Sequence, residues 1–125
     1  INAKGTGALS LQSVATGGLK IGTSTAECAV IKGIYLSAVI AVTVPSFAAE
    51  TSDSVVVDVA AAFTVQPAVG DAILAIPQAA LPTDCLQAEA YITATDMVTV
   101  TFDAKEGGGV TGAAVNYKFL LFDIT

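Results

Sequence analysis

Apolar and polar residues alternate along the last third of the chain. Between positions 89 and 102 the apolar side chains fall on every second residue in two runs, Ala90, Ile92 and Ala94, then Val98, Val100 and Phe102. Alternation of this kind is typical of strands with one buried and one solvated face. Asp96 lies between the two runs, where a short carboxylate can hydrogen-bond the backbone and favour a turn. The alternation resumes over 115–121, so we predict three antiparallel strands in sequence.

Earlier parts of the chain predict further strands, over 8–14, 19–22, 28–31, 34–44, 55–65 and 72–76. The stretch 34–44 is apolar at almost every position, which indicates that both of its faces are covered. The opposite sheet would cover one face, and a neighbouring copy could cover the other. Three alanines at 60–62 would suit a helix, but flanking valines and Pro67 favour a strand. The connection 77–84 leaves room for one helical turn.

The predicted fold is all-β: one antiparallel β-sandwich or jelly-roll domain over 8–125, with about eight short strands. Residues 1–7 lack a core-forming pattern and are expected to be a flexible arm, in which Ile1, Asn2, Ala3 and Lys4 are candidate interface residues. The turn-forming candidates are Gly70, Asp71, Asp96, Gly107, Gly108 and Gly109. The three consecutive glycines favour a hairpin turn over a phosphate loop, because no Lys-Ser or Lys-Thr follows them.

The composition is unusually apolar, with 54% hydrophobic residues, 13% charged residues and a mean hydropathy of +0.73. The longest uncharged apolar run, 33–49, is shorter than the roughly 20 residues that a membrane-spanning helix needs, and Pro45 interrupts it. We therefore expect buried strands there and no membrane partner. The excess of small apolar residues favours a chain that hides surface against other copies or a larger shell.

The charge pattern argues against nucleic acid as a partner. The chain has 11 acidic and 5 basic residues, a net charge of −6 at pH 7, whereas phosphate binding depends on clustered Lys and Arg. The single acids fit turns and strand ends on a solvated surface.

The residue types argue against catalysis and against a cofactor. Histidine is absent, as is arginine, so no imidazole can activate a thiol and no guanidinium can clamp a phosphate. Paired acids remain as candidates, namely Asp53 with Asp58, Asp71 with Asp84 and Asp96 with Asp103, but none lies in a recognisable motif. The chain lacks the spacing of a calcium-binding loop. Tyr35, Tyr91 and Tyr117 suit positions between core and solvent better than a sugar-binding platform.

The two cysteines, Cys28 and Cys85, leave two alternatives open. They could form one disulfide that closes a large loop, or remain buried thiols in a reducing cytoplasm, which we favour. A zinc site is not expected, because neither a paired-cysteine motif nor a histidine is present.

The C-terminal half carries a resemblance to a known class of protein. The order of VGDA at 69–72, Pro77, TATDMVTVTF at 93–102, a glycine-containing turn and NYKFLLF at 116–122 resembles small structural proteins of tailed phages. These are capsid decoration, cement or head-fibre proteins with β-sandwich or jelly-roll domains.

The resemblance implies a virion protein on the outer capsid surface, assembled in the host cytoplasm. Its partners would be the major capsid protein and further copies of itself, as a homotrimer, and it would stabilise the shell through multivalent contacts. Two alternatives stay open: a secreted filament or pilus-like subunit that assembles by β-strand addition, and a fibre-tip domain that binds glycans.

Overall fold

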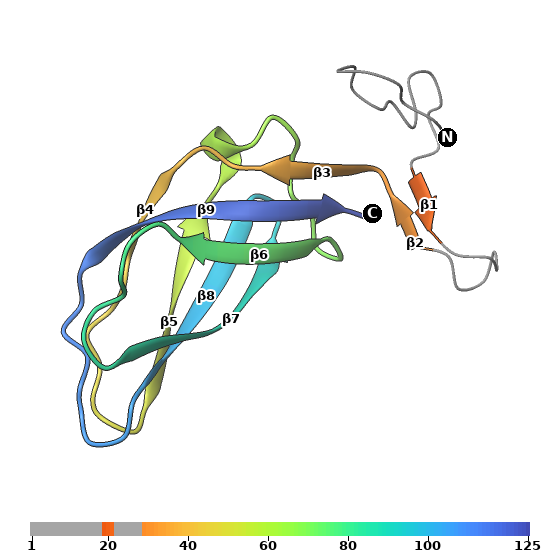
Figure 1. The fold of residues 1–125 in the computed structure, drawn as a ribbon. Helices are drawn as coiled ribbons and strands as arrows, with labels where there is room; N and C mark the ends of the chain where they lie inside the picture. The colour runs from red at the N-terminus through yellow and green to blue at the C-terminus, as the bar shows by residue number, and fades with distance from the viewer. Residues whose placement is uncertain (1–18, 22–28) are drawn as a thin grey trace, which may run out of the picture.

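The computed structural model describes residues 19–21 and 29–125, which form nine strands and one short 3₁₀ helix (Figure 1). The strands are β1 (Leu19–Ile21), β2 (Ala29–Ile31), β3 (Gly33–Leu36), β4 (Ile40–Thr43), β5 (Ser52–Asp58), β6 (Ala72–Pro77), β7 (Cys85–Ala94), β8 (Met97–Ala104) and β9 (Ala114–Asp123). The 3₁₀ helix η1 covers Ala60–Ala62. The predicted strand at 8–14 and the predicted arm at 1–7 lie outside the described residues.

All strand pairs are antiparallel and build two main sheets. β9 is the middle strand of the first sheet, because β6 pairs with it along one edge while β3 and β4 pair with it, one after the other, along the opposite edge. The second sheet has the order β5-β8-β7. The two sheets lie in separate layers in Figure 1, and β1 and β2 form a two-stranded pair that precedes β3. The predicted all-β sandwich is thus confirmed.

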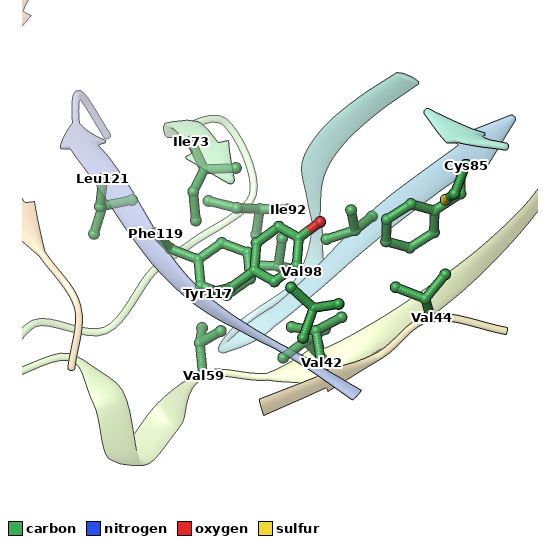
Figure 2. Close-up of a cluster of buried hydrophobic side chains, with 14 of the residues drawn as sticks. Val42, Val44, Val59, Ile73, Cys85, Ile92, Val98, Tyr117, Phe119 and Leu121 are labelled. Carbon is green, nitrogen blue, oxygen red and sulfur yellow. The ribbon is translucent and has the colours of Figure 1, made fainter. Parts of the chain in front are cut away.

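The core fills the space between the two sheets. Every second residue of β9 points inward and is buried, and Tyr117, Phe119 and Leu121 expose none of their surface. The rings of Tyr117 and Phe119 stack with centroids 6.0 Å apart at 23°, against Val42 of β4 and Val98 of β8 (Figure 2). β8 contributes Val98, Val100 and Phe102 at alternate positions, as the sequence pattern predicted.

The long strand expected at 34–44 is two strands, and only one of its faces is covered. β3 and β4 both alternate between exposed and less exposed residues, so the described chain covers one of their faces, and cover of the other face by a neighbouring copy stays a prediction. The break falls at Ser37, whose Oγ accepts a hydrogen bond from the Phe119 N–H at 2.8 Å. The Ser37 hydroxyl thereby stands in for a backbone carbonyl where the chain shifts from β3 to β4.

The strand expected at 55–65 starts earlier and ends at Asp58. The Asp58 Oδ1 accepts a hydrogen bond from the Ala60 N–H at 2.9 Å, and the Val59 carbonyl accepts one from the Ala62 N–H at 3.0 Å. These local bonds close the turn of η1, so the strand predicted across the three alanines is wrong there. The connection at 78–84 consists of bends and a turn in place of a helical turn.

β9 does not continue the sheet of β7 and β8, although the sequence suggested three antiparallel strands in succession. β7 and β8 are joined by a two-residue turn at Thr95 and Asp96, but the segment 105–113 crosses to the first sheet. Phe47 and Val110 exchange two backbone hydrogen bonds along this crossing. At Gly112 a Cβ would collide with the backbone of Val44 and Pro45, so this position requires glycine.

The Ser37 hydrogen bond generates a stability prediction. Replacing Ser37 by Ala leaves the buried Phe119 N–H without its partner, so the free energy of unfolding should fall by about 1 to 3 kcal/mol. Urea denaturation followed by circular dichroism measures the change. Ser52→Ala, at an exposed position on β5, is the control and should leave the stability within about 0.5 kcal/mol of the starting value. Equal losses in the two variants would contradict the assignment.

Candidate functional site

The outer face of the first sheet carries large apolar side chains at positions that solvent reaches. In an antiparallel sheet, residues directly opposite each other point to the same face. The inward residues of β9 are the odd-numbered ones, so its even-numbered residues and their cross-strand partners point outward. We define the apolar face by six of these outward residues, Ile34, Leu36, Leu74, Ile76, Leu120 and Phe122.

The strand register places these six side chains next to one another. Leu120 lies at the centre, paired with Leu36 on one side and with Leu74 on the other. Phe122 pairs with Ile34 in the next row toward the end of β9. Leu36 and Leu74 are 56% and 54% exposed, respectively, which is unusual for leucines in the middle of a sheet.

The apolar face is also free of acidic residues. Among the described strands of this sheet, no Asp or Glu takes an outward position, although the chain carries 11 acids. The outward charge within it is Lys118, which is half-buried and pairs with Ile76. The outward charge on this face is therefore positive, whereas the net charge of the whole chain is −6.

The outer face of the second sheet has a different chemistry. Its central outward residues on β8 are Thr99 and Thr101, and the Thr99 hydroxyl lies 3.1 Å from that of Thr93. Thr101 pairs with Glu89 and with Ser54, so this row is polar from edge to edge. This face also carries Val56, Leu86 and Tyr91 at exposed outward positions, and Thr99 is buried between Val56 and Tyr91. The outer face of the second sheet is therefore mixed in character, whereas that of the first sheet is apolar in its central rows.

The apolar face is large for a chain of this size. Four of its six side chains are 38% to 56% exposed, and Leu120 and Phe122 are half-buried. Together they form a patch on the order of 400 Å², within the range of the largest patches on soluble monomers, which are often functional. Single exposed leucines need no explanation, but a contiguous patch of this size is a candidate interaction surface. The apolar face is therefore the candidate functional site.

Sequence patterns indicated this surface only in part. The apolar run at 34–44 pointed to strands covered on both sides, and Ile34 and Leu36 belong to that run. Leu74, Leu120 and Phe122 were not singled out. Their signal is the loss of alternation, since AILAIP in β6 and FLLF in β9 are apolar at successive positions.

The three acid pairs weighed as catalytic candidates are separated by the fold. Asp53 and Asp58 lie on one strand five residues apart, about 17 Å along it. Asp96 lies in the β7–β8 turn while Asp103 lies at the far end of β8. Asp71 precedes β6 and Asp84 follows it. A glycosidase pair needs a separation below about 10 Å, which the first two pairs exceed by strand length alone.

Asp71 holds the end of the described chain. Its Oδ1 accepts hydrogen bonds from the Ile124 N–H and from both the N–H and the hydroxyl of Thr125, and its Oδ2 accepts one from the Ala68 N–H. Burial raises the pKa of Asp71, but these four hydrogen bonds outweigh it and leave the pKa below its ordinary value. The Lys32 ammonium donates to the Thr125 carbonyl beside it.

The remaining turn-forming candidates lie in turns or in the connection between β8 and β9. Asp96 adopts a left-handed conformation with φ of 61°, its N–H donates to the Pro67 carbonyl, and its carboxylate accepts a hydrogen bond from Gln66. Gly70 lies in the turn before β6 with φ of 106°. The glycines at 107–109 lie in the crossing between β8 and β9 described above.

Cys85 and Tyr117 lie inside the sandwich. Burial raises the pKa of the Cys85 thiol, and the nearby Asp103 carboxylate adds to the rise. Burial likewise raises the pKa of Tyr117 to about 12, with a contribution from Cys85. Because Tyr117 is fully buried, it cannot join Tyr35 and Tyr91 in a glycan-binding platform. Cys28 lies outside the described residues, so the choice between thiols and a disulfide stays a prediction.

Other possible sites are weaker. A hollow of about 270 Å³ beside η1 is lined by Asp58 and five small or aliphatic residues, and is smaller than most ligand pockets. Across residues 19–21 and 29–125, no three Cys, Asp or Glu side chains gather as metal ligands would. The described part of the chain also lacks any helix with the length and apolar character needed to cross a membrane.

Comparison with protein-family models, with curated proteins and with solved structures found no match to this chain.

The Asp71 hydrogen bonds predict a specific dependence of stability on pH. A carboxylate with a lowered folded-state pKa stabilises the protein fully above its unfolded-state pKa, near 3.9, and loses this contribution as the pH falls through the folded-state value. Asp71→Asn should therefore cost about 0.5 to 1 kcal/mol near pH 7, because solvent screens the three exposed hydrogen bonds to Ile124 and Thr125. The difference from the parent chain should shrink below about pH 4.

Urea denaturation at several pH values measures this difference. Asp53→Asn is the control, because the exposed Asp53 carboxylate accepts a hydrogen bond only from the N–H of its neighbour Ser54 among the described contacts. A cost for Asp71→Asn that stayed constant from pH 7 to pH 3 would refute the proposed role of the charge.

Removal of the buried Tyr117 hydroxyl should not lower the free energy of unfolding, in contrast to the loss predicted for Asp71→Asn. This oxygen has no hydrogen-bond partner among the described residues, so Tyr117→Phe removes an unsatisfied polar group while keeping the ring. The stability should stay unchanged or rise by less than about 1 kcal/mol. Tyr117→Ala, which also removes the ring, should cost about 3 to 5 kcal/mol. Thermal unfolding of the three proteins decides the matter, and a loss above about 1 kcal/mol for Tyr117→Phe would show a hidden hydrogen bond.

Proposed function

We propose that this chain is a structural protein that acts by binding to other protein subunits, as a decoration or cement protein on the outer shell of a tailed phage. The observation that carries the proposal is the contrast between the two outer faces of the sandwich. One face presents a contiguous apolar patch without carboxylates, whereas the other mixes exposed Val56, Leu86 and Tyr91 with Ser, Thr and Glu side chains. A domain that worked alone would lose solubility from the first face without gaining anything from it.

Two further observations support an assembly role. The resemblance of 69–122 to phage decoration proteins covers β6 to β9, which supply most of the apolar face. The net charge of −6 keeps free subunits apart in solution until a specific surface brings them together. The expected partner is the major capsid protein, and the expected location is the outer capsid surface.

The mechanism needs only binding free energy. Several linked subunits on one lattice raise the effective concentration of each further contact, so weak individual contacts add up to firm attachment. A protein that binds the assembled shell and not its dissociated subunits shifts the equilibrium toward the shell by mass action.

A secreted filament subunit is the second candidate, and the open edge of the first sheet favours it. Among the described strands, β6 pairs with β9 on one side only, and its sequence AILAIP carries no charge that would block a further strand. Two features limit this edge, since Gln87 donates a hydrogen bond to the Ala75 carbonyl and Pro77 lacks an N–H. A segment of a neighbouring subunit could pair there by strand addition. Electron microscopy of the native assembly separates decorated particles from filaments.

The decoration hypothesis predicts selective binding to intact shells. Capsids that lack the protein should bind it saturably, whereas dissociated shell subunits should bind it at least tenfold more weakly, because the site exists only in the lattice. Co-sedimentation with intact and with dissociated capsids measures both affinities. Equal binding to the two preparations would exclude a cement role, and added protein should also raise the temperature at which the shells disassemble.

A further inference from the structure

We infer that the apolar face is covered by the apolar face of a second copy of this chain, in a two-fold sheet-on-sheet dimer. The inference rests on the proposed function as a structural protein, and it names a second copy, in a dimer in place of the expected trimer, as the partner of this surface. Its physical basis is the chemistry of the face, its area and the position of Lys118.

The absence of carboxylates from the face favours a copy of the same chain as the occupant. Two chains that each carry a net charge of −6 repel one another over most approaches. Within the described strands, the outer face of the first sheet is free of outward Asp or Glu, so two copies can meet there without bringing carboxylates together. The polar rows of the second sheet, which include Glu89, offer no such approach.

The shape and the area of the face also fit a second sheet. Antiparallel sheets pack face to face about 10 Å apart with their strands within about 30° of one another. Leu and Phe occur on both sides of β9, as Phe119 and Leu121 on the inner side and as Leu120 and Phe122 on the outer side. Two copies would bury on the order of 800 Å² of apolar surface, which approaches the roughly 1,000 Å² that a specific interface should exceed.

Lys118 decides between the two ways in which a two-fold axis can relate the sheets. An axis parallel to β9 would place Lys118 over its own copy, and two half-buried ammonium groups would then repel one another. An axis perpendicular to the strands at Leu120 makes the two β9 strands antiparallel. Because 118 and 122 are equidistant from 120, this axis places each Lys118 over Phe122 of the other copy, where the ring face attracts a cation.

The test uses two matched glutamate substitutions in the full chain. Leu74 and Val56 both point outward from edge strands, β6 and β5, and are 54% and 60% exposed. Leu74→Glu places a charge in the apolar face, whereas Val56→Glu places one on the outer face of the second sheet. Sedimentation equilibrium over a wide concentration range measures the association, and thermal unfolding confirms that each variant is folded.

The expected result is a dimer whose dissociation constant rises at least tenfold in Leu74→Glu and changes less than threefold in Val56→Glu. A parent protein that stays monomeric, a trimer in place of a dimer, or a dimer that tolerates Leu74→Glu would each overturn the inference. If Leu74→Glu does not fold, Leu36→Thr, a milder change of an outward residue, replaces it with the same expectation.

A second substitution tests the orientation. Lys118→Met should give no gain in affinity at low salt that high salt removes, because the perpendicular axis keeps the two ammonium groups apart. Such a salt-sensitive gain would show that the ammonium groups repel one another and would overturn the perpendicular axis.

The outcome is separable from that of the capsid experiment. A monomer that binds intact shells through Leu74 overturns the dimer and supports the proposed function. A dimer without affinity for shells supports the dimer inference and contradicts the proposed function. Vesicles of neutral phosphatidylcholine are a third arm, and a monomer that binds them through Leu74 would overturn the dimer in favour of a lipid surface.

Discussion

The structure depends on β9 being paired along both of its edges. β3 and β4 bond to one edge and β6 to the other, so the strand cannot shift in register without breaking three ladders at once. The pleat of β9 then fixes both sides of the sheet. Its odd-numbered residues fill the core between the sheets, and its even-numbered residues supply the centre of the apolar face. The core of the domain and its outer apolar face are thus both properties of the same strand.

This coupling explains why the apolar face is well defined although solvent reaches it. An exposed leucine on a loop can turn away from a partner, but Leu120 is held by its neighbours on a strand that the core anchors at Tyr117, Phe119 and Leu121. A rigid apolar surface loses little conformational entropy when it binds, which favours association through many weak contacts.

Local sequence patterns predicted the strands well and their partners poorly. The alternation at 89–94 and 98–102 and the position of Asp96 between them were sufficient for the β7–β8 hairpin, because adjacent strands joined by a short turn pair by default. The same default failed for β9. Its placement depends on the crossing at 105–113, where contacts with Phe47 and the space at Gly112 select the other sheet. Ser37 likewise ends β3 through a bond to Phe119, a residue 82 positions away.

The sequence by itself determined the fold class and the presence of surplus apolar surface. Both follow from composition and from a period of two, which depend only on the local geometry of a strand. Only the tertiary structure decided where the surplus lies. A run such as AILAIP reads the same whether its second face meets another sheet or water, because periodicity does not reveal what packs on either side. The long-range pairing of β6 with β9 placed Leu74 beside Leu120, and it turned separate apolar runs into one continuous face.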